Sequence, residues 1–156
     1  MTPDQFQKEL QRLQKEFGEF YNRYAPQIAG NVAVSYFKKN FQNEAWGRVK
    51  WQEVKRRQNP KTKGARATRK ILTGNTGDLG RSIEIKSAEN GKVEIWTNPS
   101  EFTHSKEPYG RVHNEGLRSG RGSGFIMPKR QFMGESEELN KMIIDKLETK
   151  LKSITK

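Results

Sequence analysis

The sequence predicts an α+β fold, in which N-terminal and C-terminal amphipathic helices pack on a small antiparallel β-sheet and long basic and Gly-rich loops join the elements. Three observations lead to this prediction. Apolar residues recur every three to four positions near both termini, two alternating segments flank an Asn-Gly pair, and residues 41–70 lack a period. A chain of 156 residues has the length of one domain, so we expect a single domain over 1–156.

The first helix is predicted from its start signal and its apolar stripe. Thr2, Pro3 and Gln5 have the pattern of an N-cap, a first helical position and a capping-box partner. Side chains suited to one buried face then follow at helical spacing: Phe6, Leu10, Leu13, Phe17, Phe20, Tyr21 and Tyr24. Because Pro26 has no N–H and a second apolar stripe follows it, the pattern predicts two consecutive helices, or one helix kinked at Ala25 and Pro26.

Residues 41–70 have no regular spacing of apolar residues and are strongly basic. Between residues 38 and 70 there are 12 lysines and arginines against two glutamates, a net charge of +10. Asn59-Pro60 breaks the backbone pattern in the middle of this stretch. We expect 41–70 and the glycine-rich segment 118–124 to be mobile loops. Trypsin should therefore cut the free subunit first within 55–70 and 118–124.

A β-hairpin is predicted over residues 81–97. Alternate residues are apolar in both of its strands, at Ile83 and Ile85 and then at Val93 and Ile95. Asn90-Gly91 lies between the strands and suits the positive φ angles of a type I′ turn. The alternation and the turn pair agree, so the sequence predicts both the strands and their pairing.

A C-terminal helix is predicted from about residue 135 to residue 153. Leucine and isoleucine recur there every four residues, at Leu139, Ile143, Leu147 and Leu151. Acidic residues open this segment and lysines close it, as the helix dipole favours. Upstream, residues 98–108 are predicted to be irregular and residues 109–116 to form a short helical turn.

Little in the sequence can support catalysis. Its imidazoles, His104 and His113, have no nucleophile beside them and no metal-ligand spacing. The stretch Thr73-Gly74-Asn75-Thr76-Gly77 lacks the lysine of a phosphate-binding loop, and we interpret it as a turn. We expect no enzymatic activity, no metal and no cofactor. There is no cysteine and no apolar run of roughly 20 residues, so we expect a cytosolic protein without membrane contact.

The basic stretch supplies eight candidates for contact with a partner or with nucleic acid: Lys55, Arg56, Arg57, Lys61, Lys63, Arg66, Arg69 and Lys70. Such residues neutralise phosphates, and the indoles of Trp46 and Trp51 can stack on bases, which favours a nucleic-acid-binding module that uses residues 48–70. The same composition fits a solvated loop anchored to the core by its tryptophans. It also fits a loop that faces an acidic partner in an assembly.

Four blocks, in order along the chain, resemble the phage virion morphogenesis family, which includes tail completion proteins. ILTGNTGDLGRSI at 71–83 resembles the family's I-L-x-x-T-G-x-L-x-x-S-I block. Residues 41–51 are similar to its stretch with a Gly and a Trp before a basic segment. YGRVHNEG at 109–116 resembles Y-A-x-x-H-x-x-G, and MPKRQFMG at 127–134 resembles I-P-x-R-P-F-L-G. Two positions depart from the pattern, because Glu53 and Gln131 stand where the family often has proline.

The resemblance implies a non-enzymatic structural protein of the virion, assembled in the host cytoplasm, that acts in tail completion or in head-tail joining. Both steps stay open at this point. Subunits that contact each other head to tail and close on themselves form a ring, so we expect a ring-shaped homo-oligomer. We expect its partners to be other phage tail or head-tail connector proteins, with non-specific contact with DNA as an alternative.

Arg130, Phe132 and Met133 are candidate oligomer-interface residues, together with the apolar faces of the helices. Aromatic and arginine side chains are enriched in interface cores, and a small sheet cannot cover two apolar helix stripes. The alternative is that Phe132 fills the core of its own subunit. In that case its replacement by alanine costs about 3 to 5 kcal/mol of stability.

Overall fold

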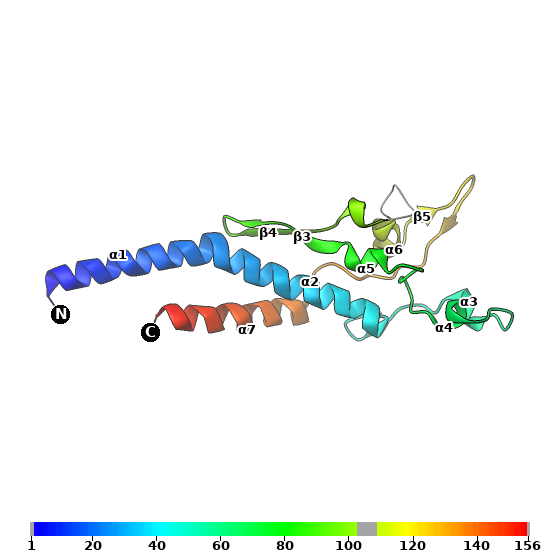
Figure 1. The fold of residues 1–156 in the computed structure, drawn as a ribbon, viewed down its shortest axis with the longest axis horizontal. Coiled ribbons are helices and arrows are strands. Elements are labelled where there is room, and N and C mark those ends of the chain that lie inside the picture. The colour runs from blue at the N-terminus through cyan, green and yellow to red at the C-terminus, as the bar shows by residue number, and fades with distance from the viewer. Residues whose placement is uncertain (1, 103–108, 156) are drawn as a thin grey trace. The chain divides into compact units, whose positions relative to one another are not determined.

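The computed structural model describes residues 2–102 and 109–155, and in it the predicted α+β class is confirmed (Figure 1). Long helices lie at both ends of the chain, with small two-stranded sheets between them in sequence. The chain divides into two compact units. The first comprises Met1–Val34, Ile85–Ile95 and Glu137–Lys156, and the second comprises Ser35–Glu84 and Trp96–Ser136. The single-domain organisation stays a prediction.

The first unit begins with an uninterrupted helical run. Helix α1 spans Pro3–Glu19, and its predicted capping box is present, since Thr2 and Gln5 bond reciprocally. A π-helical turn, η1, follows over Phe20–Tyr24, and α2 spans Ala25–Asn43. The irregularity predicted at Ala25 and Pro26 therefore lies in the turn just before them. Pro26 offers no N–H to its own helix, and the π turn absorbs the lost bond without ending the run.

The predicted hairpin is confirmed: β3 spans Ile83–Glu89 and pairs with β4, which spans Lys92–Thr97. Asn90 and Gly91 have φ angles of 51° and 71°, the positive values that a type I′ turn needs. Within the first unit the hairpin lies close against α2. A Cβ atom on Gly30 would fall 2.6 Å from Cδ1 of Ile85, so this glycine sets the approach of helix and strand.

Helix α7, Glu137–Ile154, begins and ends close to its predicted bounds and lies alongside α1 (Figure 1). Its predicted stripe is the covered face: Leu139 is buried, and Ile143, Leu147 and Leu151 are half-buried. By contrast, none of the side chains of α1 is buried. Phe6 is 55% exposed, Leu10 50% and Phe17 40%, so the described chain leaves most of the stripe of α1 uncovered.

The second unit contains short elements that were expected to be loop. Helix α2 runs on to Asn43, and the segment after it forms the strand pair β1 (Ala45–Trp46) and β2 (Val49–Lys50) and the single-turn helices α3 (Lys55–Gln58) and α4 (Ala65–Thr68). The remaining elements are α5 (Asp78–Arg81), η2 (Pro99–Glu101), α6 (Gly110–Glu115), β5 (Arg118–Ser119) and β6 (Phe125–Ile126). The predicted helical turn at 109–116 is confirmed as α6, which ends at Gly116 in the left-handed conformation.

The core of the second unit forms around Phe132, which is 1% exposed. Its ring lies 5.1 Å from that of Phe41, which in turn meets the indole of Trp51 edge-on at 5.6 Å. Leu79 and Ile83, both fully buried, belong to the same core. The apolar stripe of α2 thus continues to Phe41, and this packing extends the helix past the predicted end.

Side-chain amides hold the backbone around Phe132 in place. Asn114 of α6 accepts from the N–H groups of Phe132 (2.8 Å) and Met133 (3.0 Å) and donates to the Met133 carbonyl. Asn40, which is 4% exposed, donates to the carbonyl of Phe132. Two of the sequence blocks, 109–116 and 127–134, are therefore hydrogen-bonded to each other, and this network fixes a segment without regular secondary structure.

Candidate functional site

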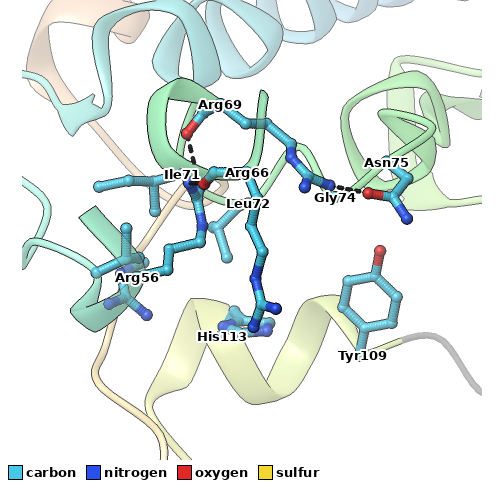
Figure 2. Close-up of a pocket in the computed structure, with 11 residues that line it drawn as sticks. Arg56, Arg66, Arg69, Ile71, Leu72, Gly74, Asn75, Tyr109 and His113 are labelled. Atoms are coloured by element: carbon cyan, nitrogen blue, oxygen red, sulfur yellow. Dashed lines mark hydrogen bonds between the residues drawn. The ribbon is translucent and has the colours of Figure 1, made fainter. Parts of the chain in front are cut away.

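A cavity of about 510 Å³ lies within the second unit, between α3, α4 and α6 (Figure 2). We call it the arginine cavity, after four of its lining residues: Arg56, Arg66, Arg69 and Arg130. The other described residues that line it are Val54, Ile71, Leu72, Gly74, Asn75, Tyr109 and His113. Ile71 (2% exposed) and Arg130 (6% exposed) are buried, whereas Arg66 and Asn75 are exposed, so the cavity leads from solvent to a buried floor.

The lining formed by these described residues contains no carboxylate. The acids nearby already have arginine partners outside the lining. Glu44 and Glu53 both pair with Arg57, and Asp78 pairs with Arg81. The positive charge of the four lining arginines is therefore only partly balanced by the acids around them, since Glu44 and Glu53 act on Arg56, and Glu53 acts on Arg130, without an ion pair to either. Guanidinium groups in a cavity of this kind bind anions, because an oxyanion supplies both the missing charge and the missing acceptors.

Backbone carbonyls and an amide hold three of these arginines. Arg56 donates to the carbonyl oxygens of Arg66 (2.7 Å), Arg69 (2.7 Å) and Lys70 (3.0 Å), and so ties α3 to the chain around α4. Arg130 donates through Nε to the carbonyl of Gln52 at 3.0 Å. Arg69 donates to Oδ1 of Asn75, a bond drawn as a dashed line in Figure 2. Their guanidinium groups are thus positioned before any ligand arrives.

In Figure 2 the side chain of Arg66 points toward His113, and the hydroxyl of Tyr109 points toward Asn75. The His113 ring meets that of Tyr109 edge-on at 5.9 Å, and its Nδ1 atom is buried with no hydrogen-bond partner among the described residues. Burial and then the charge of Arg130 lower the pKa of His113, so its imidazole is neutral at pH 7.

Burial is the main cause that lowers the pKa of two of the lining arginines. For Arg56 the neighbouring cations of Arg57 and Arg69 lower the pKa further, while the carboxylates of Glu44 and Glu53 act in the opposite direction. Burial also lowers the pKa of Arg130, and the carboxylate of Glu53 opposes this shift. Both stay protonated, because the ordinary pKa of arginine is far above neutrality. An anion in the cavity would offset these unfavourable terms.

The eight basic residues predicted to contact a partner have different surroundings in the structure, and their role in a contact stays a prediction. Arg56, Arg66 and Arg69 line the cavity. Arg57 pairs with Glu44, and Lys70 donates to the carbonyl of Gln42, so both hold the chain together. The remaining three are exposed lysines: Lys55, Lys61 and Lys63.

Sequence reasoning did not place Arg130 or His113 beside the basic segment. The sequence makes Arg130 a candidate for an oligomer interface and gives His113 no place in a site. The two sequence blocks at 109–116 and 127–134 contain these residues and could have indicated that they lie together. In the structure the backbone N–H of Arg130 donates to the carbonyl of His113 at 2.7 Å. His104 lies outside the described residues.

The candidate interface residues lie in or near the core of the second unit. Phe132 is 1% exposed and Arg130 6%, while Met133 is half-buried. The burial of Phe132 favours the alternative that this ring fills the core of its own subunit. A role of Arg130, Phe132 and Met133 in an oligomer stays a prediction, which the Phe132 variant described below tests.

The two tryptophans of the basic segment anchor it. Trp51 is 7% exposed and donates through its indole N–H to the carbonyl of Gln131 at 2.7 Å. Trp46 packs on Phe37, with ring centroids 6.2 Å apart, and meets Tyr36 edge-on. The indole of Trp51 is therefore not an open platform on which a base could stack, and Trp46 is half-buried.

The described residues offer neither a metal site nor a membrane-spanning helix. Residues 2–102 and 109–155 contain no group of three or more His, Cys, Asp or Glu side chains arranged to hold a metal ion. Among the same residues, no helix has the length and apolar character that crossing a membrane requires.

Comparison with known proteins identifies the family. No curated protein and no solved structure matches this sequence. Residues 2–152 match the model of the phage virion morphogenesis family, and this span contains all four blocks and nearly the whole chain. The protein therefore belongs to the phage virion morphogenesis family.

Proposed function

We propose that the protein is a non-enzymatic structural component of the virion that acts in tail completion or head-tail joining. It does so as a ring of identical subunits that contact neighbouring tail or connector proteins, after assembly in the host cytoplasm. Membership of the family supports the structural role. The observation that carries self-assembly is the uncovered stripe of α1, where Phe6, Leu10 and Phe17 are 40% exposed or more.

The stripe has the spacing of a helix-helix interface. Its positions, Phe6, Leu10, Leu13, Phe17, Phe20 and Tyr24, alternate steps of four and three residues, which is the repeat of knobs-into-holes packing. Phe20 is buried within the first unit, and the residues before it are left for a partner. A neighbouring subunit that covers this stripe removes apolar surface from water and gains roughly 25 cal/mol per Å² of it.

Sedimentation of the full chain tests self-assembly. We expect the wild type to sediment as an oligomer and Leu10→Glu to sediment as a monomer with an unchanged thermal unfolding transition. Lys8→Glu, on the polar side of the same helix, is the control and should leave the oligomer intact. A wild type that stays monomeric at high concentration, or a Leu10→Glu variant that still assembles, would contradict the proposal.

Position in the virion is tested on particles. We expect phage that lacks the protein to accumulate heads and tails that do not join, or tails without a finished end. Antibody labelling of complete virions in the electron microscope should mark the end of the tail that meets the head. Labelling elsewhere on the particle, or normal virions without the protein, would exclude this role.

The alternative function is a nucleic-acid-binding module that uses residues 48–70. The observation in its favour is the exposure of Lys55, Lys61 and Lys63. Binding of a DNA duplex through these lysines should weaken steeply between two salt concentrations, because each phosphate contact releases a counterion. Their joint replacement by glutamine should reduce the salt dependence, and unchanged binding would exclude the module.

A further inference from the structure

We propose that the arginine cavity is a receptor for a carboxylate side chain that a neighbouring protein of the virion presents. This inference rests on the proposed function, because it assigns one contact in the assembly to a definite site. The ligand class is an acidic segment of a protein, with a glutamate as the group that enters.

The first argument is the unbalanced charge of the lining. Arg56, Arg66 and Arg69 come from the basic segment and Arg130 from a segment far along the chain, yet all four line one cavity. Their acidic neighbours are already engaged by Arg57 and Arg81. A carboxylate has two oxygens that together accept about four hydrogen bonds, so a single acidic side chain can accept from guanidinium groups on two sides of the cavity.

The second argument is that donors remain available after the internal bonds are counted. Arg56 uses three of its five N–H groups on backbone carbonyls. Arg66 reaches into the cavity from α4 toward His113 (Figure 2). Nδ1 of His113 is buried without a described partner, which marks this wall as polar and unsatisfied. The guanidinium groups of Arg56, Arg69 and Arg130 are held in place by the fold, so binding requires little ordering of this part of the site.

The third argument separates a protein ligand from DNA. Val54, Ile71, Leu72 and the ring of Tyr109 give the cavity apolar walls, against which the methylene stem of a glutamate packs. A phosphodiester has further phosphates on either side, and proteins meet such a backbone with exposed cations along a groove. Here Arg130 is only 6% exposed and Trp51, which could have stacked on bases, is buried. The recess and its apolar walls therefore favour a single inserted side chain.

The test uses the full-length protein and a fluorescein-labelled hexaglutamate peptide, with binding followed by anisotropy at about 0.15 M salt. Arg66→Gln removes a lining charge on an exposed side chain. Arg48→Gln removes one exposed charge outside the lining and is the matched control. We expect Arg66→Gln to weaken peptide binding by roughly tenfold or more and Arg48→Gln by less than about twofold. Equal weakening in both variants would mean diffuse attraction and would overturn the proposal.

A local signal shows whether the peptide reaches the cavity. In a His104→Gln background, the imidazole of His113 gives the one remaining histidine side-chain resonance in an NMR spectrum of the protein. Hexaglutamate should shift this resonance when Arg66 is present and should leave it unchanged in Arg66→Gln. Arg66→Lys should recover part of the affinity, because it keeps the charge but loses the planar fork. An unmoved His113 signal at saturating peptide would overturn the proposal, whatever the anisotropy shows.

A DNA arm distinguishes the two ligand classes. We expect Arg66→Gln and Arg48→Gln to reduce the affinity for a short DNA duplex by the same small factor relative to the wild type. Non-specific attraction predicts this result, because each variant removes one positive charge. If Arg66→Gln instead weakens the duplex selectively and leaves hexaglutamate unchanged, the cavity binds phosphate and the proposal is wrong. Failure of the peptide experiment leaves the sedimentation and labelling experiments untouched, so the two proposals fail separately.

Discussion

The backbone carbonyl of Asn22 accepts a hydrogen bond from the backbone N–H of Asn90 across 2.8 Å. Asn22 stands four residues before Pro26, the position whose N–H would bond this carbonyl in a regular α-helix. Pro26 has no N–H to give, so the carbonyl is available to the tip of the hairpin. The irregular turn in the long helix is thus the point where the β3–β4 hairpin is attached to it.

Close contact at this attachment predicts a cost for any side chain on Gly91. Its φ angle is 71°, and a Cβ atom there would fall 2.3 Å from Cζ of Tyr21. We expect Gly91→Ala to lower the free energy of unfolding by about 1 to 2 kcal/mol for the left-handed backbone alone, and by more for the contact. Urea unfolding of Gly91→Ala in the wild type and in Tyr21→Ala separates the two contributions. Equal costs in both backgrounds would show that Tyr21 moves aside freely.

The burial of Phe132 predicts a stability effect in place of an assembly effect. Phe132→Ala should lower the free energy of unfolding by about 3 to 5 kcal/mol, because it leaves a cavity beside Phe41. Phe125, which is 56% exposed, provides the control, and its replacement by alanine should cost under about 1 kcal/mol. Thermal unfolding and sedimentation are measured on both variants. If Phe132→Ala associates more weakly but is as stable as the wild type, Phe132 contributes to the oligomer interface.

The pairing of Glu44 with Arg57 predicts that the stability of the fold falls at low pH. The Arg57 guanidinium, 2.5 Å away, lowers the pKa of Glu44 below its ordinary value of 4.5. A carboxylate whose pKa is lower in the folded state stabilises the fold above its unfolded pKa, and this contribution is lost as the pH falls through the folded value.

We therefore expect Glu44→Gln to be about 1 to 3 kcal/mol less stable than the wild type near pH 7, since hydrogen bonds to charged groups are lost. The difference should shrink as the pH falls below the ordinary carboxyl pKa. Glu94→Gln removes an acid that is 57% exposed beside Lys86, and it should change stability by under about 1 kcal/mol. A difference for Glu44→Gln that stays constant with pH would contradict this account.

Trypsin should reveal which part of the basic segment is mobile. Arg56 and Arg57 are bonded to carbonyls and carboxylates, whereas Lys61 and Lys63 are exposed between α3 and α4. We expect the first cuts in the free subunit after these two lysines and after Arg121 in the glycine-rich segment, because exposed chain that is bonded only within its own turns opens first. Mass spectrometry of early fragments identifies the sites. First cleavage within α7 would contradict this prediction, because it would show that α7 opens before the basic and glycine-rich segments do.

The terminal helices and the hairpin could be predicted because each carries a local signal. The capping box of Thr2 and Gln5 and the positive φ angles at Asn90 and Gly91 depend on residues next to one another. Periodic apolar residues indicated the covered face of α7 in the same way. Local chemistry and final structure agree at these positions, so a single sequence suffices.

The order of the basic segment could not be predicted, because its bonds are not periodic. Arg56 bonds to carbonyls that lie 10 to 14 residues further along the chain, and any residue type offers a carbonyl. The cavity likewise depends on Arg130, whose neighbour His113 lies on another element. Such long-range contacts leave no pattern that propensity or alternation detects.

One hydrogen bond of Glu44 can form only late in the synthesis of the chain. Its carboxylate accepts from the N–H of Ile71, 27 residues later, at 2.6 Å. During synthesis the end of α2 leaves the ribosome well before this donor exists. At roughly 5 to 20 residues per second, about 1 to 5 s pass before Ile71 follows. The Glu44 carboxylate therefore lacks this donor on the nascent chain over the whole interval, and the end of α2 is joined to the chain after the basic segment only once Ile71 has been made.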